Sequence, residues 1–201
     1  MRPQTHALIV IDVQNDFCPG GALAVPGGDQ VVAPVNALMQ DHAVVVLSQD
    51  WHPAGHSSFA TSHPGLTPFE TVEMPYGLQV LWPDHCVQGT PGAAFHPGLD
   101  TARADLILRK GFRPAIDSYS AFYENDRTTP TGLHGYLQTR GVERLTLCGL
   151  ATDFCVQYSA LDAARLGYAV EVDLTASRGI DLEGSLEAAL TAMRRAGVAL
   201  D

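Results

Sequence analysis

Short runs of branched apolar residues recur along the chain, and the stretches between them carry apolar positions every three or four residues. Five of these runs are near-continuous rather than alternating, which is typical of strands buried on both faces of a parallel sheet. They predict strands at residues 6–13, 42–50, 104–110, 142–150 and 167–174, and a short last strand at 198–200.

The stretches between the apolar runs have helical periodicity. Helices are predicted within residues 29–40, 131–141, 152–167 and 182–197. Asp29 is a candidate cap for the first helix, Pro34 falls in or near its first turn, and Gly141 ends the second. Strands that alternate with helices predict an open α/β sheet with helices on both faces.

Composition narrows the class of protein. The chain has 201 residues, of which 46% are hydrophobic, and this suits a single domain, residues 1–201, with a substantial core. Its 12 basic and 22 acidic residues give a net charge of -10. Without a basic stripe we expect no nucleic-acid partner, and no apolar run is long enough to span a membrane.

The N-terminal segment and the cysteines indicate the cellular compartment of the protein. The segment "MRPQTHALIVIDVQNDF" has a short apolar stretch that ends at Asp12, with no small-residue cleavage pattern, so we expect no signal peptide. Four irregularly spaced cysteines do not form a disulfide framework. We therefore expect a cytoplasmic protein, for which monomer and homodimer are both compatible with the sequence.

Residues 49–100 break the regular pattern. This region has no clean strand or helix period, and seven of the 13 prolines and five of the eight histidines lie between Trp51 and Asp100. A long irregular segment inside a compact domain usually forms a binding site. We expect a metal-binding loop region here.

Four chemically distinctive residues follow the predicted strands. Asp12 ends the first strand, Asp50 the second and Lys110 the third, and Cys155 comes a few residues after the fourth. In open α/β sheets the ligand crevice lies outside the carboxyl ends of the strands. Two acids, one base and one thiol should therefore meet at one edge of the sheet.

This group suits nucleophilic catalysis. A cysteine in the first turn of a helix is favoured as thiolate by the backbone N–H groups, and Lys110 would add positive charge. Asp12 could take the thiol proton and later return it to a leaving group. Alone, Cys155 could equally be a small buried hydrophobe, Asp12 a turn residue and Lys110 a solvated strand end. Cys148, in mid-strand, is expected to be core filling.

The histidine-rich loop offers metal ligands. Asp50 and His52 are two residues apart, so in an extended segment both face the same way. His56 follows in the same segment, and "WPDHCVQGTPGA" adds His85. Imidazoles with one carboxylate suit one divalent ion, Zn²⁺, Fe²⁺ or Mn²⁺. The alternative interpretation is that these loop histidines contact only solvent and bind no metal.

Five segments in order resemble the nicotinamidase branch of the isochorismatase-like cysteine hydrolases. They are "DVQNDFCPGGALAVPGGD", "SQDWHPAGHSSFA", "LWPDHCVQGTPGA", "KGFRPAIDSYSAF" and "GLATDFCV". The resemblance implies a three-layer α/β/α fold with a mostly parallel central sheet. It also implies a catalytic triad, which maps onto Asp12, Lys110 and Cys155.

The resemblance extends to the binding residues. It implies metal ligation by Asp50, His52 and His85, with His56 matching a fourth ligand of some members. The aromatic residues that pack on the substrate ring map onto Phe17, Trp82 and Tyr119. A cis peptide would fall at Leu150-Ala151, two residues that the resemblance also places against the substrate. The N–H groups of Ala151 and Cys155 would form an oxyanion hole.

The implied reaction is hydrolysis of nicotinamide to nicotinate and ammonia through a cysteine thioester, a step of NAD salvage. Pyrazinamide, a near-isostere, should also be accepted. An isochorismatase or N-carbamoyl amidase would keep the fold, but such relatives generally lack the ligands of "DWHP" and "WPDH". A non-catalytic ligand-binding module is a third hypothesis, against which the complete triad argues.

Overall fold

Six parallel strands form the centre of the molecule. A computed structural model describes residues 4–201. Residues 1–3, part of the predicted domain and of the segment expected to lack a signal peptide, lie outside the described residues. The sheet order is β5-β2-β1-β6-β7-β8, and every neighbouring pair is parallel. The strands are β1 His6–Ile11, β2 Val44–Asp50, β5 Leu106–Lys110, β6 Arg144–Leu150, β7 Ala169–Arg178 and β8 Ala199–Leu200.

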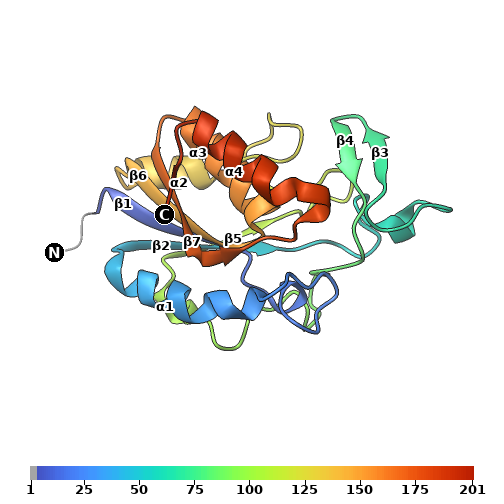
Figure 1. The fold of residues 1–201 in the computed structure, drawn as a ribbon, viewed down its shortest axis with the longest axis horizontal. Coiled ribbons are helices and arrows are strands. Elements are labelled where there is room, and N and C mark those ends of the chain that lie inside the picture. Colours follow the sequence, from blue (N-terminus) through green and yellow to red (C-terminus); the bar gives the residue numbers. More distant parts are fainter. Residues whose placement is uncertain (1–3) are drawn as a thin grey trace.

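Helices cover both faces of the sheet, so the molecule has three layers. The helices are α1 Val32–Asp41, α2 Leu133–Thr139, α3 Gln157–Arg165 and α4 Ser185–Arg195. In Figure 1, α1 lies below the sheet and α2, α3 and α4 lie above it. This arrangement confirms the predicted α/β class, the parallel sheet and the helix-covered faces.

Burial explains the pattern of the strands. All seven residues of β2 are buried, and so are five of the six in β1, because helices cover these central strands on both sides. The edge strand β5 instead alternates between half-buried and exposed residues before the buried Lys110. Burial on both faces therefore marks the middle of the sheet and alternating burial marks its edge, although the apolar run of β5 is itself near-continuous.

Two local expectations are wrong. The region 49–100 holds a short antiparallel hairpin, β3 Thr71–Met74 and β4 Gly77–Val80, which projects beyond the sheet in Figure 1. Its strands have four residues each, of which only Gln79 is buried, so they leave no apolar run to detect. Asp29 does not cap α1, because a 3₁₀ turn at Gly28–Val31 precedes the helix and Val31 takes the cap position.

Other expectations hold. Pro34 is the third residue of α1, where its missing N–H costs no helical hydrogen bond. All four cysteines are free and buried. Among residues 4–201, no helix has the length and apolar character needed to cross a membrane.

Candidate active site

The carboxyl ends of the central strands bring the acids, the base and the thiol together. Asp12 follows β1 directly, and Asp50 pairs in register with Lys110 at the ends of β2 and β5. Cys155 lies in the turn that follows β6. Parallel pairing sends all four strands out of the sheet at the same edge, which is why residues so far apart in the chain meet.

The Lys110 ammonium is the centre of this group. Its Nζ lies 2.8 Å from Asp12 Oδ2, 2.9 Å from Asp50 Oδ1 and 3.4 Å from Cys155 Sγ. It also donates to the Ser118 carbonyl at 2.9 Å. An ammonium has three hydrogens and here four neighbours, so it acts on the sulfur as a nearby positive charge.

Asp12 is held in an uncommon backbone conformation. Its φ is +48°, in the left-handed region that non-glycine residues rarely adopt outside functional sites. The Ser48 hydroxyl donates to Asp12 Oδ1 at 2.6 Å. Burial raises the pKa of Asp12, and the nearby Lys110 charge opposes that rise. A carboxylate with a raised pKa is a better proton acceptor at neutral pH.

The environment of the site favours the neutral form of the Cys155 thiol and the charged form of Lys110. Burial raises the pKa of Cys155 well above its ordinary value, although the Lys110 charge works the other way. Burial disfavours the charged form of Lys110, but Asp12 and Asp50 outweigh it and raise the lysine pKa well above its usual range. The geometry thus presents a neutral thiol beside a permanent cation, with a carboxylate available to remove the thiol proton.

The turn that carries Cys155 differs from the expected helix start. Residues Thr152–Val156 form a π-helical turn that leads into α3, rather than the first turn of an α-helix. The peptide bond Leu150-Ala151 is cis, as the resemblance implies. Gly149 has φ +116°, and a Cβ there would collide with the backbone of Ile11 on the neighbouring strand. Only glycine lets β1 and β6 approach this closely.

Asp50, His52 and His85 form a buried group whose candidate ligand atoms all lie within 4.8 Å of one another. Asp50 Oδ2 lies 3.0 Å from His52 Nε2 and 3.3 Å from His85 Nε2. The Nδ1 atoms face the carbonyls of Gly111 at 2.9 Å and Pro83 at 2.8 Å. A carbonyl only accepts, so each Nδ1 carries the proton and each Nε2 can offer its lone pair to a metal. These donors fit a divalent ion.

Glycine is required beside this group. Gly111 has φ +66°, and an added Cβ would lie 2.5 Å from His52 Cε1 and 3.0 Å from Asp50 Oδ1. The residue after Lys110 therefore has to be glycine for the chain to pass so close to the imidazole.

His56 is placed differently from the other predicted ligands. Its Nε2 faces the carbonyls of Arg113 at 2.9 Å and Ile116 at 3.2 Å, and its Nδ1 lies 2.8 Å from the Ser58 hydroxyl. It forms a second possible ligand group with His52 and Asp117. His52 faces both groups through Nε2, so the two groups are alternatives. Metal ligation by His56 stays a prediction.

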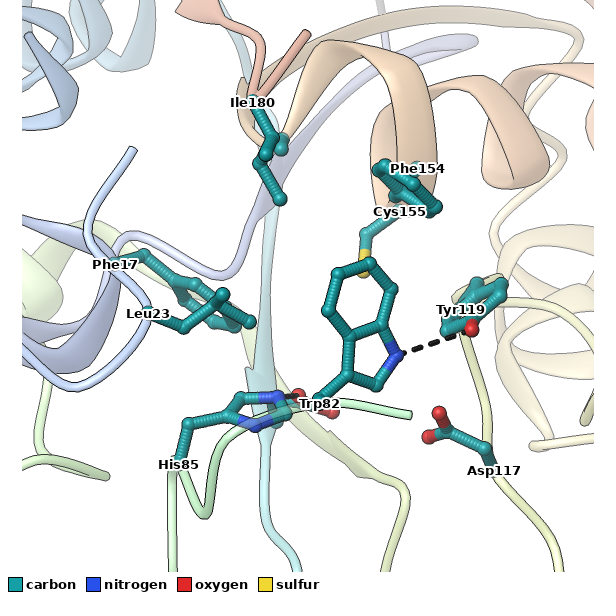
Figure 2. Close-up of a pocket in the computed structure, with 11 residues that line it drawn as sticks. Phe17, Leu23, Trp82, His85, Asp117, Tyr119, Phe154, Cys155 and Ile180 are labelled. Carbon is teal, nitrogen blue, oxygen red and sulfur yellow. Dashed lines mark hydrogen bonds and ion pairs between the residues drawn. The ribbon is translucent and has the colours of Figure 1, made fainter. Parts of the chain in front are cut away.

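A pocket opens beside the thiol. The space between its walls is about 330 Å³, open solvent at the mouth included. Figure 2 shows Cys155 and Phe154 on one side and His85 on another, with the Trp82 ring between them. The lining residues are Phe17, Leu23, Asp50, Trp82, His85, Asp117, Tyr119, Ala151, Phe154, Cys155 and Ile180.

The predicted ring-packing residues Phe17, Trp82 and Tyr119 all line this pocket. Trp82 Nε1 donates to the Tyr119 hydroxyl at 3.1 Å, and the Trp82 ring meets Phe154 edge-on at 4.9 Å between centroids. Hydrogen bonding and edge contacts fix these rings before any ligand enters. Leu150, also predicted to contact substrate, is fully buried and does not line the pocket, whereas Ala151 does.

Sequence reasoning did not place four lining residues in the pocket: Leu23, Asp117, Phe154 and Ile180. The first three stand inside the quoted motif segments, so their position in those segments was a usable signal. Ile180 follows the end of β7 in an irregular loop, and nothing in the apolar pattern marks it.

Comparison with known proteins agrees with this geometry. The model of the Isochorismatase domain matches residues 6–200, nearly the whole chain. The chain belongs to the isochorismatase family. The resemblance inferred from the five segments is thereby confirmed, and the three-layer parallel fold is that of solved family members.

Individual family members are closely similar. The nicotinamidase of Acinetobacter baylyi is 53% identical over 192 residues, covering 96% of this chain and 90% of the relative. The solved nicotinamidase/pyrazinamidase of Acinetobacter baumanii superposes with a TM-score of 0.98 at 54% identity, covering 100% and 97% of the two chains. A pyrazinamidase of Pyrococcus horikoshii solved with zinc has a TM-score of 0.79 at 37% identity, and 98% of each chain is covered.

Proposed function

We propose that this protein is a nicotinamidase that hydrolyses nicotinamide to nicotinate and ammonia. The observation that carries the proposal is the shared pocket, which Cys155, Asp50 and His85 line together with the rings of Phe17 and Trp82. A flat ring between the aromatic walls would have its carboxamide near the sulfur and its nitrogen near the imidazole. The nicotinamidase and pyrazinamidase relatives support this substrate class.

The pocket suits a small aromatic amide. Its volume is small, and its walls are mostly apolar apart from Asp50, His85, Asp117 and the thiol. Asp50, His52 and His85 would hold a divalent metal, which when bound supplies a Lewis-acid contact for a ring nitrogen. The zinc-bound relative supports zinc, while the donor set also suits iron or manganese.

Asp12 and Cys155 carry the first half of the reaction. Asp12 takes the proton from the Cys155 thiol, and the sulfur forms a bond to the carboxamide carbon. The N–H groups of Ala151 and Cys155 donate to the resulting oxyanion. Asp12 then gives its proton to the nitrogen as the carbon–nitrogen bond breaks, which releases ammonia and leaves a thioester.

The same residues complete the second half. Asp12 takes a proton from a water molecule whose oxygen adds to the thioester carbon. The carbon–sulfur bond breaks, nicotinate leaves, and the sulfur recovers its proton. Throughout both halves Lys110, 3.4 Å from Sγ, stabilises negative charge on the sulfur.

The same site bears on the range of substrates, the metabolic role and the cellular compartment. Pyrazinamide differs from nicotinamide by one ring nitrogen, so a pocket built on ring stacking should accept both. Nicotinamide hydrolysis belongs to NAD salvage, and four free cysteines are compatible with the reducing cytoplasm in which we place it.

The test is ammonia release from nicotinamide by the purified protein. We expect the wild-type protein to turn over nicotinamide. In Cys155→Ala the rate should fall by a factor of about 10⁴ or more, since no other thiol lines the pocket. A metal chelator should also lower the wild-type rate. Cys148→Ala is the control, because this core cysteine should affect stability rather than rate. Full turnover in Cys155→Ala would refute the mechanism.

The alternatives give other results. No bound metal and turnover of an N-carbamoyl compound or isochorismate instead of nicotinamide would favour another substrate of the same fold. Tight nicotinamide binding without ammonia release would favour a non-catalytic module.

A further inference from the structure

Asp153 is a buried carboxylate in the turn of the nucleophile that points away from the pocket. It lies two residues before Cys155 and is 3% exposed, yet it is absent from the residues that line the pocket. Among residues 4–201 no Lys, Arg or His side chain pairs with it. A buried carboxylate without a cation is costly unless it accepts several hydrogen bonds.

The hydrogen bonds of Asp153 come from one segment, residues 179–185, which we call the wall loop. Asp153 Oδ1 accepts from Ile180 N at 2.9 Å, and Oδ2 accepts from Asp181 N at 2.8 Å and from the Ser185 hydroxyl. Ser185 is the first residue of α4, whose N-terminus favours a negative charge. The carboxylate therefore ties the π-helical turn to the start of α4.

The wall loop depends on this anchor. Its backbone has positive φ at three of five consecutive residues, +58° at Asp181, +50° at Glu183 and +86° at Gly184. Asp181 and Glu183 are also exposed to solvent, so burial of their own side chains does not hold them in this uncommon conformation. A Cβ at Gly179 would lie 3.1 Å from Asp153 Oδ1, which shows how closely the loop passes the carboxylate.

The wall loop also forms part of the pocket. Ile180 is half-buried, and Figure 2 shows its side chain reaching toward the pocket beside Phe154 and Cys155. The same residue gives its backbone N–H to Asp153. One carboxylate thus joins the turn that bears the nucleophile to an apolar wall that a bound ring would touch.

We propose that Asp153 is a positioning residue that holds the wall loop, and with it Ile180, against the substrate ring. This second proposal rests on the proposed function for the identity of the substrate ring. Loss of the carboxylate should release the wall and weaken ring binding, while the distance from Lys110 to the sulfur, set by the strand ends, is retained. The effect belongs mainly to KM rather than kcat, because the wall contacts substrate and transition state alike.

Steady-state kinetics of Asp153→Asn test the proposal. We expect KM for nicotinamide to rise about tenfold and kcat to change less than about threefold, a split that a collapsed turn would not give. Asp162→Asn is the matched control, since Asp162 is a buried carboxylate on the following helix α3 that pairs with Arg165 instead. In an Ile180→Ala background, Asp153→Asn should raise KM little further.

Two further measurements do not depend on turnover. Amide hydrogen exchange at Ile180 and Asp181 should accelerate in Asp153→Asn and stay unchanged in Asp162→Asn. Alkylation of Cys155 by iodoacetamide should proceed at nearly the wild-type rate in both variants. An unchanged KM with unchanged exchange would overturn the proposal, as would a kcat loss that exceeds the KM change.

The two proposals can fail separately. If the wild-type protein does not hydrolyse nicotinamide, the proposed function is wrong. Exchange and alkylation would still decide whether Asp153 holds the wall loop without disturbing the thiol.

Discussion

Two sets of residues make up the site in and behind the pocket, and different parts of the fold position them. The first set, Asp12, Lys110 and Cys155, stands at or just after strand ends, and sheet pairing sets its geometry. The second set supplies the imidazole of His85 and the ring of Trp82 from an irregular loop. There, single hydrogen bonds to backbone carbonyls or to other side chains fix each side chain.

This difference shows which part of the fold determines the reaction and which part determines binding. The strand-end set holds the reacting groups in a frame that cannot shift without breaking the sheet. The loop set holds the groups that would bind metal and ring, in a frame that can change residue by residue. Damage to the first set should remove chemistry, and damage to the second should weaken binding.

The largest effect is expected for Lys110→Met in the strand-end set. Methionine keeps most of the length and removes the charge, which leaves Asp12 and Asp50 buried without their cation. We expect kcat to fall about 10³-fold and the free energy of unfolding to fall by about 3–5 kcal/mol. Ammonia release and urea unfolding measure the two changes.

The neighbouring Arg109 provides the control for this substitution. Its guanidinium is exposed and lies over the Trp51 ring at 3.9 Å, away from the thiol. Arg109→Met should leave kcat unchanged. A kcat for Lys110→Met within tenfold of the wild-type value would contradict the role of the strand-end set.

The next effect concerns the loop set. His85→Ala removes one of three grouped ligands, so affinity for the metal should fall about 100-fold or more. Elemental analysis after dialysis against chelators of graded strength measures the affinity. His96→Ala, in the same long loop but outside both candidate ligand groups, should retain the metal. Equal metal content in both variants would remove His85 from the site.

Gly111→Ala gives a smaller effect and a clean control. Gly111 and Gly141 share φ +66°, but a Cβ at Gly111 meets His52 whereas a Cβ at Gly141 meets nothing within 4 Å. Both variants should lose about 1 kcal/mol of stability from backbone strain, and Gly111→Ala should lose more because its Cβ would collide with the His52 ring. Only Gly111→Ala should also weaken metal binding, by about tenfold. Similar metal affinities in the two variants would show that the loop adapts to the extra atom.

The smallest effect is expected in a turn outside the pocket. Burial opposes the charged form of Asp126, but hydrogen bonds from Thr129 and Thr128 lower its pKa to about 2. A carboxyl with a lowered folded-state pKa stabilises the fold above its ordinary value of 3.8 and loses that contribution as the pH falls to about 2.

Urea unfolding of Asp126→Asn across this pH range tests the expectation. The variant should be less stable at pH 6, by under about 1 kcal/mol because solvent screens this turn. The difference from wild type should vanish near pH 2. A difference that does not change with pH would mean that the charge of Asp126 contributes nothing.

The sequence predicts the strand-end set better than the loop set, for a physical reason. Strands covered on both faces need unbroken apolar runs, so the central strands are visible in the pattern, and the edge strands β5 and β8 also carry short apolar runs. The residues that follow parallel strands are known to share an edge. The hairpin at Thr71–Met74 and Gly77–Val80 has a single buried residue, Gln79, and leaves no such pattern.

The pocket shows the same limit. Trp82 and Tyr119 could be predicted only through resemblance to a family, because nothing in their spacing sets where a loop folds back. The role of Asp153 as an anchor is even harder to predict from the sequence. Its partners at Ile180, Asp181 and Ser185 lie 27 to 32 residues further along the chain, and two of them contribute only backbone N–H groups.

The parallel strand order has a consequence for how the chain folds. Lys110 contacts Asp50 across 60 residues of chain and Cys155 across 45. Each contact requires closure of a long loop before any local contact offsets its entropy. We therefore expect the reacting groups to assemble late, after β5, β2, β1 and β6 have paired. A polypeptide still being synthesised stays catalytically silent until Cys155 has joined the sheet edge.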